Sequence, residues 1–301
     1  MDETQIEENK ETLLTPEFLG KLEQLHLVSK KVFLGRMKGE RRSRRRGTSV
    51  EFADYRDYAR GDDLRFLDWN IYGRLDRLFV KLFYEEEDLH VYIVLDGSLS
   101  MEYGDPKKYL HARRFAAALA YIALASLDRV GIGVFSADRF DWLQPVRGAG
   151  QINKILRFLE DAEPGGATDL ETGALQFRVR QSRPGIILFI SDFLDPSGFE
   201  ESLRVFSQGK NEVYAIQVLA PEEVDPDLAG ALRLLDLETE EPVEVSVSAE
   251  LIRNYRRRLT AYQEAIRDFC KRRRIHFLMT RSDDDFFDLV NISLRRLGLV
   301  E

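Results

Sequence analysis

Residues 91–101 read VYIVLDGSLSM: five apolar residues are followed by oxygen-bearing side chains at every second position. A short, continuous apolar run is typical of a strand that is buried on both faces of a parallel sheet. Similar runs recur at residues 130–135, 186–190 and 213–219. Helical patterns lie between them, over about residues 107–127, 151–160 and 170–181. Because apolar strands that alternate with helices indicate βαβ units, we predict an α/β fold with a doubly wound, mainly parallel sheet.

The sequence after residue 130 supplies further elements of the same domain. The pattern predicts a hairpin strand at about 139–143, helices near 199–206 and over 249–273, a strand at 275–279 and a final helix.

The N-terminal part has a different character. Residues 1–12 are acidic and almost free of apolar side chains, which predicts a disordered tail. Residues 13–33 show the apolar spacing of an amphipathic helix, and residues 30–46, with nine Lys/Arg against one acid, predict a loop. We therefore divide the chain into a tail (1–12), a smaller N-terminal region (13–88) and a sheet domain (89–301).

The composition excludes several classes of protein. A formal net charge of -8 argues against nucleic acid as the partner, and the single cysteine, Cys270, excludes an internal disulfide. No run approaches the roughly 20 apolar residues of a membrane helix. The opening residues, MDETQIEENKE, lack the basic start and apolar centre of a secretory signal. We expect a cytoplasmic protein without membrane insertion.

Three predicted strand-end loops carry oxygen ligands. Asp96, Ser98 and Ser100 follow the first strand, Thr168 lies in the loop PGGATD, and Asp192 follows the strand that ends near residue 190. Ligands of parallel sheets bind at the carboxyl ends of the strands, where such loops meet. Hydroxyls and carboxylates suit Mg²⁺, Mn²⁺ or Ca²⁺ and suit zinc poorly. An ion held mainly by neutral hydroxyls keeps positive charge and an open position for a partner's carboxylate.

Each loop also has a purely structural interpretation. Asp96 and the two serines fit a turn or a helix cap, Thr168 with Glu171 fits a capping box, and Asp192 or Asp195 fits a cap with Pro196 in the first turn. Under this alternative the chain is an interaction domain without metal. The coincidence of three such loops at different strand ends favours the metal site.

These residues resemble the metal-ion-dependent adhesion site of von Willebrand A domains. Asp96-x-Ser98-x-Ser100, Thr168 and Asp192 occupy its five positions. The resemblance covers residues from about 89 to the end and implies a Rossmann-type sheet. It also implies that the serines and the threonine bind the ion directly and that the aspartates often act through water.

A second, narrower resemblance lies upstream and extends to Asp192. It rests on Glu51-Phe52, Tyr55-Arg56-Asp57-Tyr58, Gly61-Asp62-Asp63-Leu64-Arg65, Asp68-Trp69-Asn70 and Arg74. This signature is similar to that of the "domain of unknown function fifty-eight" family, which joins it to a von Willebrand A-like domain. Members are commonly encoded near MoxR-type AAA+ ATPases, so the resemblance implies such an ATPase as the partner.

An enzymatic alternative is a Mg²⁺-dependent hydrolase in which Asp96 or Asp192 activates water. Ser98 stands where phosphatases with an aspartate nucleophile carry a second carboxylate, so the general acid is missing. None of the four histidines lies in a ligand loop, which leaves a nucleophilic serine without a base. Gly131-x-Gly133 lies inside a predicted strand and lacks the third glycine of a dinucleotide site. We therefore predict a non-enzymatic module that binds a protein partner through a Mg²⁺ ion.

The basic cluster Arg41–Arg46 is the remaining candidate for a contact. It has no interleaved aromatic residues, so a solvated loop or a contact with acidic segments is favoured over nucleic-acid binding.

Overall fold

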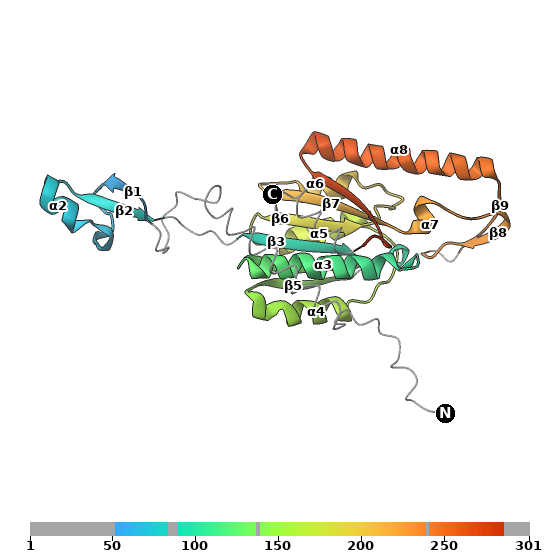
Figure 1. Cartoon of the computed structure of the whole chain (residues 1–301), viewed down its shortest axis with the longest axis horizontal. Coiled ribbons are helices and arrows are strands. Elements are labelled where there is room, and N and C mark those ends of the chain that lie inside the picture. Colours follow the sequence, from blue (N-terminus) through green and yellow to red (C-terminus); the bar gives the residue numbers. More distant parts are fainter. Residues whose placement is uncertain (1–51, 84–88, 137–138, 239–240, 286–301) are drawn as a thin grey trace, which may run out of the picture. The chain divides into compact units, whose positions relative to one another are not determined.

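The computed structural model describes residues 52–83, 89–136, 139–238 and 241–285, shown in colour in Figure 1. They belong to two compact units, one within residues 33–88 and one that contains the residues from Leu89 onward. The predicted tail, the helix at 13–33, the basic loop at 30–46 and the final helix lie outside the described residues. The domain boundaries at 12 and 88 stay predictions.

The smaller unit is a β-hairpin with a short helix in its connection. Strand β1 (Phe52–Asp57) pairs antiparallel with β2 (Phe79–Phe83), and α2 (Trp69–Leu75) lies between them in the chain. Asp68 caps this helix by accepting hydrogen bonds from the backbone N–H groups of Asn70 and Ile71. The described part of this unit therefore consists of a two-stranded sheet and a helix whose N-terminus is capped by Asp68.

Asp68 also joins the helix to the hairpin. Its carboxylate pairs with Lys81 over 3.0 Å and accepts a hydrogen bond from the Tyr55 hydroxyl over 3.0 Å. These contacts, the Lys81 bond first, lower the pKa of Asp68 to about 2. Arg56 pairs with Asp62 over 2.8 Å nearby. The signature residues of this region thus pair with one another within their own unit.

The larger unit is built on a six-stranded sheet in the order β10-β7-β6-β3-β4-β5. Its strands are β3 (His90–Asp96), β4 (Arg129–Ser136), β5 (Arg139–Arg147), β6 (Ile186–Ser191), β7 (Glu212–Leu219) and β10 (His276–Arg281). All neighbouring pairs are parallel except β4–β5. Only two residues separate β4 from β5, too few for the crossover that a parallel pair needs. The predicted α/β fold with a doubly wound, mainly parallel sheet is confirmed.

The strand order reverses beside β3. The chain moves from β3 outward through β4 and β5, then returns to the other side of β3 for β6, β7 and β10. The loops after β3 and β6 therefore leave in opposite directions. Such a switch point opens a crevice at the carboxyl ends of the strands, where ligands of this class of sheet bind.

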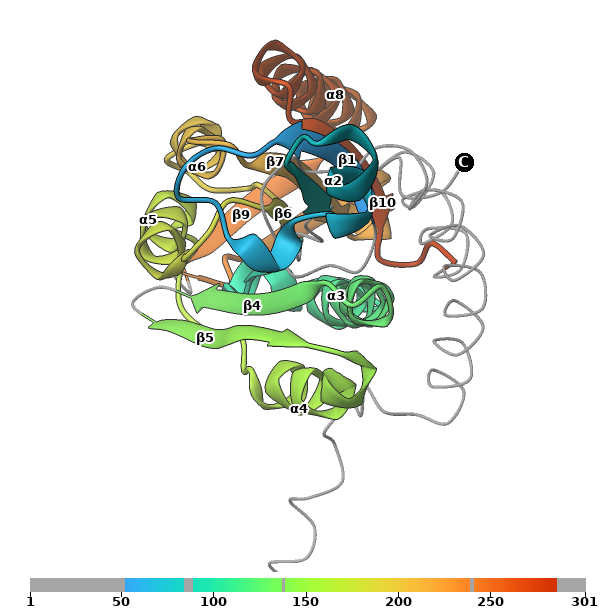
Figure 2. The same cartoon turned by 90° about the vertical axis from the view of Figure 1, so that its left-hand side faces the viewer.

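Helices cover both faces of the sheet (Figure 2). On one side lie α3 (Lys108–Ala125) and α4 (Ile152–Asp161). On the other lie α5 (Leu170–Arg180), α6 (Glu200–Phe206) and α8 (Ala249–Arg273). Strand β3 is buried along its whole length because it packs against both layers.

A hairpin that the sequence reasoning did not assign follows β7 and the short helix α7 (Pro221–Val224). Strands β8 (Gly230–Leu235) and β9 (Pro242–Val247) pair antiparallel as a separate two-stranded sheet. Most of their residues are exposed. Figure 1 shows the hairpin at the end of the unit toward which the parallel strands point.

The two glycines of β4 serve packing. A Cβ on Gly133 would lie 2.7 Å from the ring of Phe140, and one on Gly131 would lie 3.1 Å from Pro145. Both partners belong to the edge strand β5, so the missing Cβ atoms of the glycines leave room for the side chains of Phe140 and Pro145 over β4. This placement inside a strand agrees with the rejection of a dinucleotide site.

His111 on α3 gives the larger unit a pH-dependent stability. Burial, aided by the charge of Arg114, lowers the pKa of His111 from 6.5 to about 4, although Asp283, Asp284 and the Ser282 backbone oppose this shift. Below about pH 6.5, His111 is therefore protonated in the unfolded chain, whereas in the folded chain it stays neutral until about pH 4. Stability falls as the pH falls from there toward 4.

The free energy of unfolding of the parent should fall between pH 7 and pH 5. In His111→Leu this fall should be smaller by about 2 kcal/mol. Urea unfolding at both pH values measures this difference. An equal loss in parent and variant would show that His111 does not carry the effect.

Candidate metal centre

Asp96 ends β3 and anchors the loop that follows it. Its side chain is fully buried. One carboxylate oxygen accepts a hydrogen bond from the backbone N–H of Ser98 over 2.9 Å, and the other accepts one from the Ser191 hydroxyl over 2.7 Å. Because Ser191 ends β6, Asp96 connects the two strands on either side of the switch point.

Three hydroxyls from two loops form a continuous row next to Asp96. Ser98 Oγ lies 3.0 Å from Ser100 Oγ, which lies 3.3 Å from Thr168 Oγ1. The backbone closes the same two loops together: Leu99 N donates to Gly166 O over 3.0 Å, and Gly165 N donates to Gly97 O over 2.8 Å. Ser100 and Thr168, 68 positions apart, thus belong to one group of side-chain hydroxyls.

Asp192 follows β6 directly, and both oxygens of its carboxylate accept hydrogen bonds. One oxygen accepts the backbone N–H of Leu194 over 2.9 Å, and the other accepts the Lys108 ammonium over 2.7 Å. Gln217 on β7 donates to the Asp192 carbonyl over 2.9 Å. Asp192 and Lys108 are both fully buried.

The next residue, Phe193, adopts an unusual backbone conformation. Its φ is 59°, a left-handed value that costs free energy for a residue with a bulky side chain. The surrounding structure compensates, because Phe193 N donates to Ser191 Oγ over 2.9 Å and Tyr262 OH donates to Phe193 O over 2.5 Å. The position of Asp192 is therefore fixed by β6, β7 and α8 together.

The centre carries more negative than positive charge. Lys108 Nζ pairs with Glu223 over 2.6 Å as well as with Asp192, so these two carboxylates share one ammonium, and the Asp96 carboxyl group interacts with Asp192 without a cationic partner of its own among the described contacts. Burial, followed by the charge of Asp192, raises the pKa of Asp96 to about 7. Burial also raises the pKa of Glu223. A bound cation would relieve the repulsion between Asp96 and Asp192.

The donor set fits a hard divalent cation. Among the described residues there is no group of three or more His, Cys, Asp and Glu that could hold a metal ion. A cation here would therefore depend on the hydroxyls of Ser98, Ser100 and Thr168 together with Asp96 and Asp192. Oxygen ligands of this kind suit Mg²⁺, Mn²⁺ or Ca²⁺. The structure brings the five residues together, and metal binding itself stays a prediction.

Two of the structural alternatives are wrong. The N-cap of α5 is Asp169, which accepts a hydrogen bond from Thr172 N over 2.9 Å, so Thr168 is not the capping residue. Helix α6 begins at Glu200, which places Pro196 before the helix and outside its first turn. The turn interpretation of Asp96 is confirmed by its bond to Ser98 N, and it is compatible with a metal site.

Sequence reasoning missed several residues that complete the centre. Each of them makes a hydrogen bond to one of the five predicted residues or to Lys108. They are Lys108, Ser191, Gln217, Glu223 and Glu238. One signal was present for Lys108. It lies in the first turn of α3, where the helix macrodipole disfavours a cation unless carboxylates face it.

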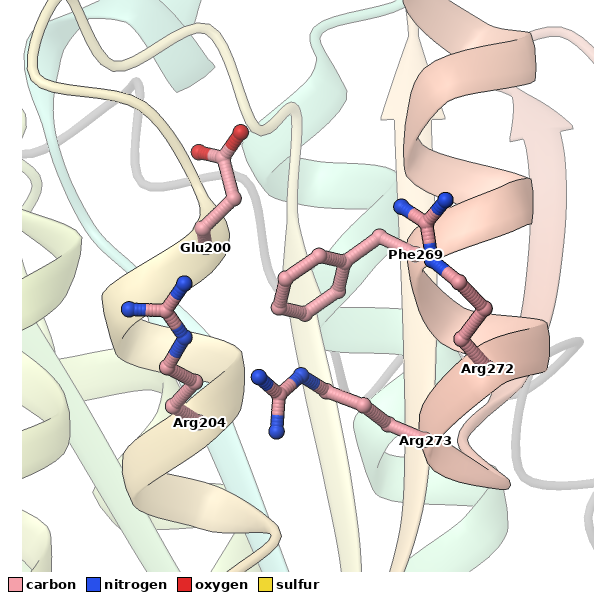
Figure 3. A pocket seen from close by; sticks show the side chains of 5 residues that line it. All are labelled: Glu200, Arg204, Phe269, Arg272 and Arg273. Carbon is pink, nitrogen blue, oxygen red and sulfur yellow. The ribbon is translucent and has the colours of Figure 1, made fainter.

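A hollow of about 590 Å³ lies between α6 and α8, away from the residues of the candidate metal centre named above (Figure 3). Its lining is formed by Glu200, Arg204, Phe269, Arg272 and Arg273. Arg273 stacks over the ring of Phe269, 4.8 Å from its centroid. Arg272 and Arg273 are exposed at the end of α8.

A family model described as "Protein of unknown function DUF58" matches residues 54–266. The chain belongs to this family. The DUF58 chain is 26% identical over 290 residues to an uncharacterized protein of Mycobacterium bovis. This alignment covers 94% of the chain and 91% of that relative. The predicted family is thus confirmed.

Solved structures similar to this DUF58 chain include two of lower identity. BatB from Bacteroides thetaiotaomicron has a TM-score of 0.45 and 15% identity, over 70% of the DUF58 chain and 98% of BatB. The VWA domain of SpRpn10 has a TM-score of 0.41 and 12% identity, over 69% of the DUF58 chain and 96% of that domain. Within the described residues of the DUF58 chain, no helix has the length and apolar character needed to cross a membrane.

Proposed function

We propose that this DUF58 chain is a metal-dependent protein-binding module. A divalent cation, Mg²⁺ in the first instance, would be held by the hydroxyls of Ser98, Ser100 and Thr168 with Asp96 and Asp192. The row of hydroxyls next to two buried carboxylates, at the switch point of the sheet, is the observation that carries this proposal. When bound, the cation would supply a positive charge for a partner's Asp or Glu.

The surroundings of the centre support a protein partner. Tyr103 and Leu194 follow the Asp96 and Asp192 loops and are 41% and 39% exposed. These two side chains would supply apolar contacts to a protein bound at the centre. The family resemblance implies a MoxR-type AAA+ ATPase as that partner, and we propose an Asp or Glu on its surface as the group that is bound.

The geometry supports binding over hydrolysis. Both carboxylate oxygens of Asp96 accept hydrogen bonds from the protein, and Asp192 is paired with Lys108. A general base must instead reach the water that it activates. Asp96 and Asp192 instead make hydrogen bonds and an ion pair within the protein, which gives the alternative of a Mg²⁺-dependent hydrolase less support.

The proposal is tested by affinity capture on the immobilised chain, with Mg²⁺ present or chelated by EDTA. We expect a partner that is retained with Mg²⁺ and released by EDTA. Ser100→Ala removes one hydroxyl of the row and is expected to lose this retention, whereas Ser197→Ala, an exposed serine beyond Asp195, should keep it. Equal retention by the parent with and without Mg²⁺ would contradict metal-dependent binding.

A further inference from the structure

The turn of the β8–β9 hairpin places a carboxylate on the row of hydroxyls. Thr168 Oγ1 donates a hydrogen bond to Glu238 Oε1 over 2.5 Å. The two residues are 70 positions apart, so the tertiary fold creates this contact. Thr168 is only 8% exposed, and Glu238 is half-buried. The contact therefore holds the Glu238 carboxylate against a largely buried hydroxyl of the row.

The local structure of the turn directs Glu238. Its backbone N–H donates to Asp236 Oδ1 over 2.8 Å, and Asp236 N donates to Glu241 O over 3.1 Å, which closes the hairpin. The two strands bury little of their own surface. A two-stranded hairpin with so little burial is marginal by itself, so contacts at its tip matter for where it lies.

Glu238 contacts the same row of hydroxyls that is proposed to hold the cation. Lys108 is already shared by Asp192 and Glu223, and Asp96 is buried close by. Glu238 brings a further carboxylate to the Thr168 hydroxyl. A carboxylate that already contacts this row of hydroxyls is a suitable oxygen ligand for a hard divalent cation bound by the same hydroxyls.

We propose that Glu238 is a carboxylate ligand of the cation at the strand-end loops, and that metal binding ties the β8–β9 turn to the sheet domain. This assignment rests on the proposed function, because it assumes that the cation binds. It gives the centre a sixth residue, from an element that the resemblance to known sites does not include. A partner's carboxylate that enters the same position must displace the turn.

Two measurements with Mn²⁺ test the assignment. Calorimetric titration of the full chain should show a Mn²⁺ affinity about 10-fold lower for Glu238→Gln than for the parent, as is typical when a group next to a metal loses its charge. Hydrogen exchange of residues 230–247 should slow on addition of Mn²⁺ in the parent and stay unchanged in Glu238→Gln. Glu244→Gln, an exposed change on the same hairpin, should match the parent in both.

The outcomes separate this assignment from the proposed function. Equal Mn²⁺ affinity and equal hairpin protection in the parent and Glu238→Gln would overturn the role of Glu238 and leave the metal centre intact. Absence of Mn²⁺ binding by the parent would overturn both.

Discussion

Lys108→Met is expected to lower the free energy of unfolding by about 3–5 kcal/mol, since it leaves buried carboxylates without their counter-charge. The ammonium of Lys108 lies 2.7 Å from Asp192 and 2.6 Å from Glu223. The side chains of Lys108 and Asp192 are fully buried, and that of Glu223 is 14% exposed. Water therefore cannot replace the lost ammonium. Urea unfolding at pH 7 measures the change.

The neighbouring lysine is a matched control for this substitution. Lys107 is 48% exposed and pairs with Glu102 over 2.8 Å, so Lys107→Met should cost less than about 1 kcal/mol. Adding Glu223→Gln to Lys108→Met should recover part of the loss, because one of the uncompensated charges is removed. Equal destabilisation by the two lysine substitutions would show that the buried ion pair does not stabilise the domain.

Asp96→Asn is expected to weaken Mn²⁺ binding by about 10–100-fold or more while leaving the fold of the unbound chain intact. Asparagine has the shape of aspartate: its amide oxygen can still accept the hydrogen bond from Ser98 N, and its NH2 group can donate to Ser191 Oγ in place of the bond that Asp96 accepts from that hydroxyl. It also replaces a carboxyl group whose pKa is raised by burial and then by the charge of Asp192 with a neutral one, so no buried charge has to be kept at this position. The metal-linked rise in melting temperature should therefore disappear without a fall in the metal-free melting temperature.

Asp169→Asn provides the control at the same rim. Asp169 is exposed and caps α5 through Thr172 N, a role that asparagine fills equally well. This variant should keep the parent's Mn²⁺ affinity, measured by calorimetry alongside Asp96→Asn. An Asp96→Asn protein that binds Mn²⁺ as tightly as the parent would remove Asp96 from the centre.

The sheet and its site loops could be predicted because their signals are local. The apolar run Val91–Leu95 marks a strand buried on both faces, and the residue after it must lie at the carboxyl end of the sheet. The same reasoning placed Asp192 after β6. Strand order brings the loops after β3 and β6 together, as the doubly wound pattern predicted. The prediction that Thr168 also lies at a strand end is wrong, because its loop connects α4 to α5, and its place beside Ser100 depends on how these helices pack.

The supporting residues could not be predicted because their role depends on tertiary burial. Lys107 and Lys108 are adjacent and chemically identical, yet one is largely exposed and the other fully buried between two carboxylates. Spacing alone does not distinguish them. Which side of α3 faces the centre is settled only when the helix packs on the sheet.

The β8–β9 hairpin was missed for a different reason. Val243, Val245 and Val247 alternate with polar residues, which is the pattern of a strand. The sheet that they form has no buried face of its own, so the apolar runs that identified the main sheet are absent there. Its link to the metal centre, through Glu238 and Thr168, joins distant parts of the chain.

The most direct measurement is anomalous diffraction from crystals of the full chain grown with Mn²⁺. The account predicts a peak in contact with the hydroxyls of Ser98, Ser100 and Thr168, next to Asp96 and Asp192. Crystals in which Mn²⁺ occupies other positions and leaves these hydroxyls bonded only to one another would contradict it.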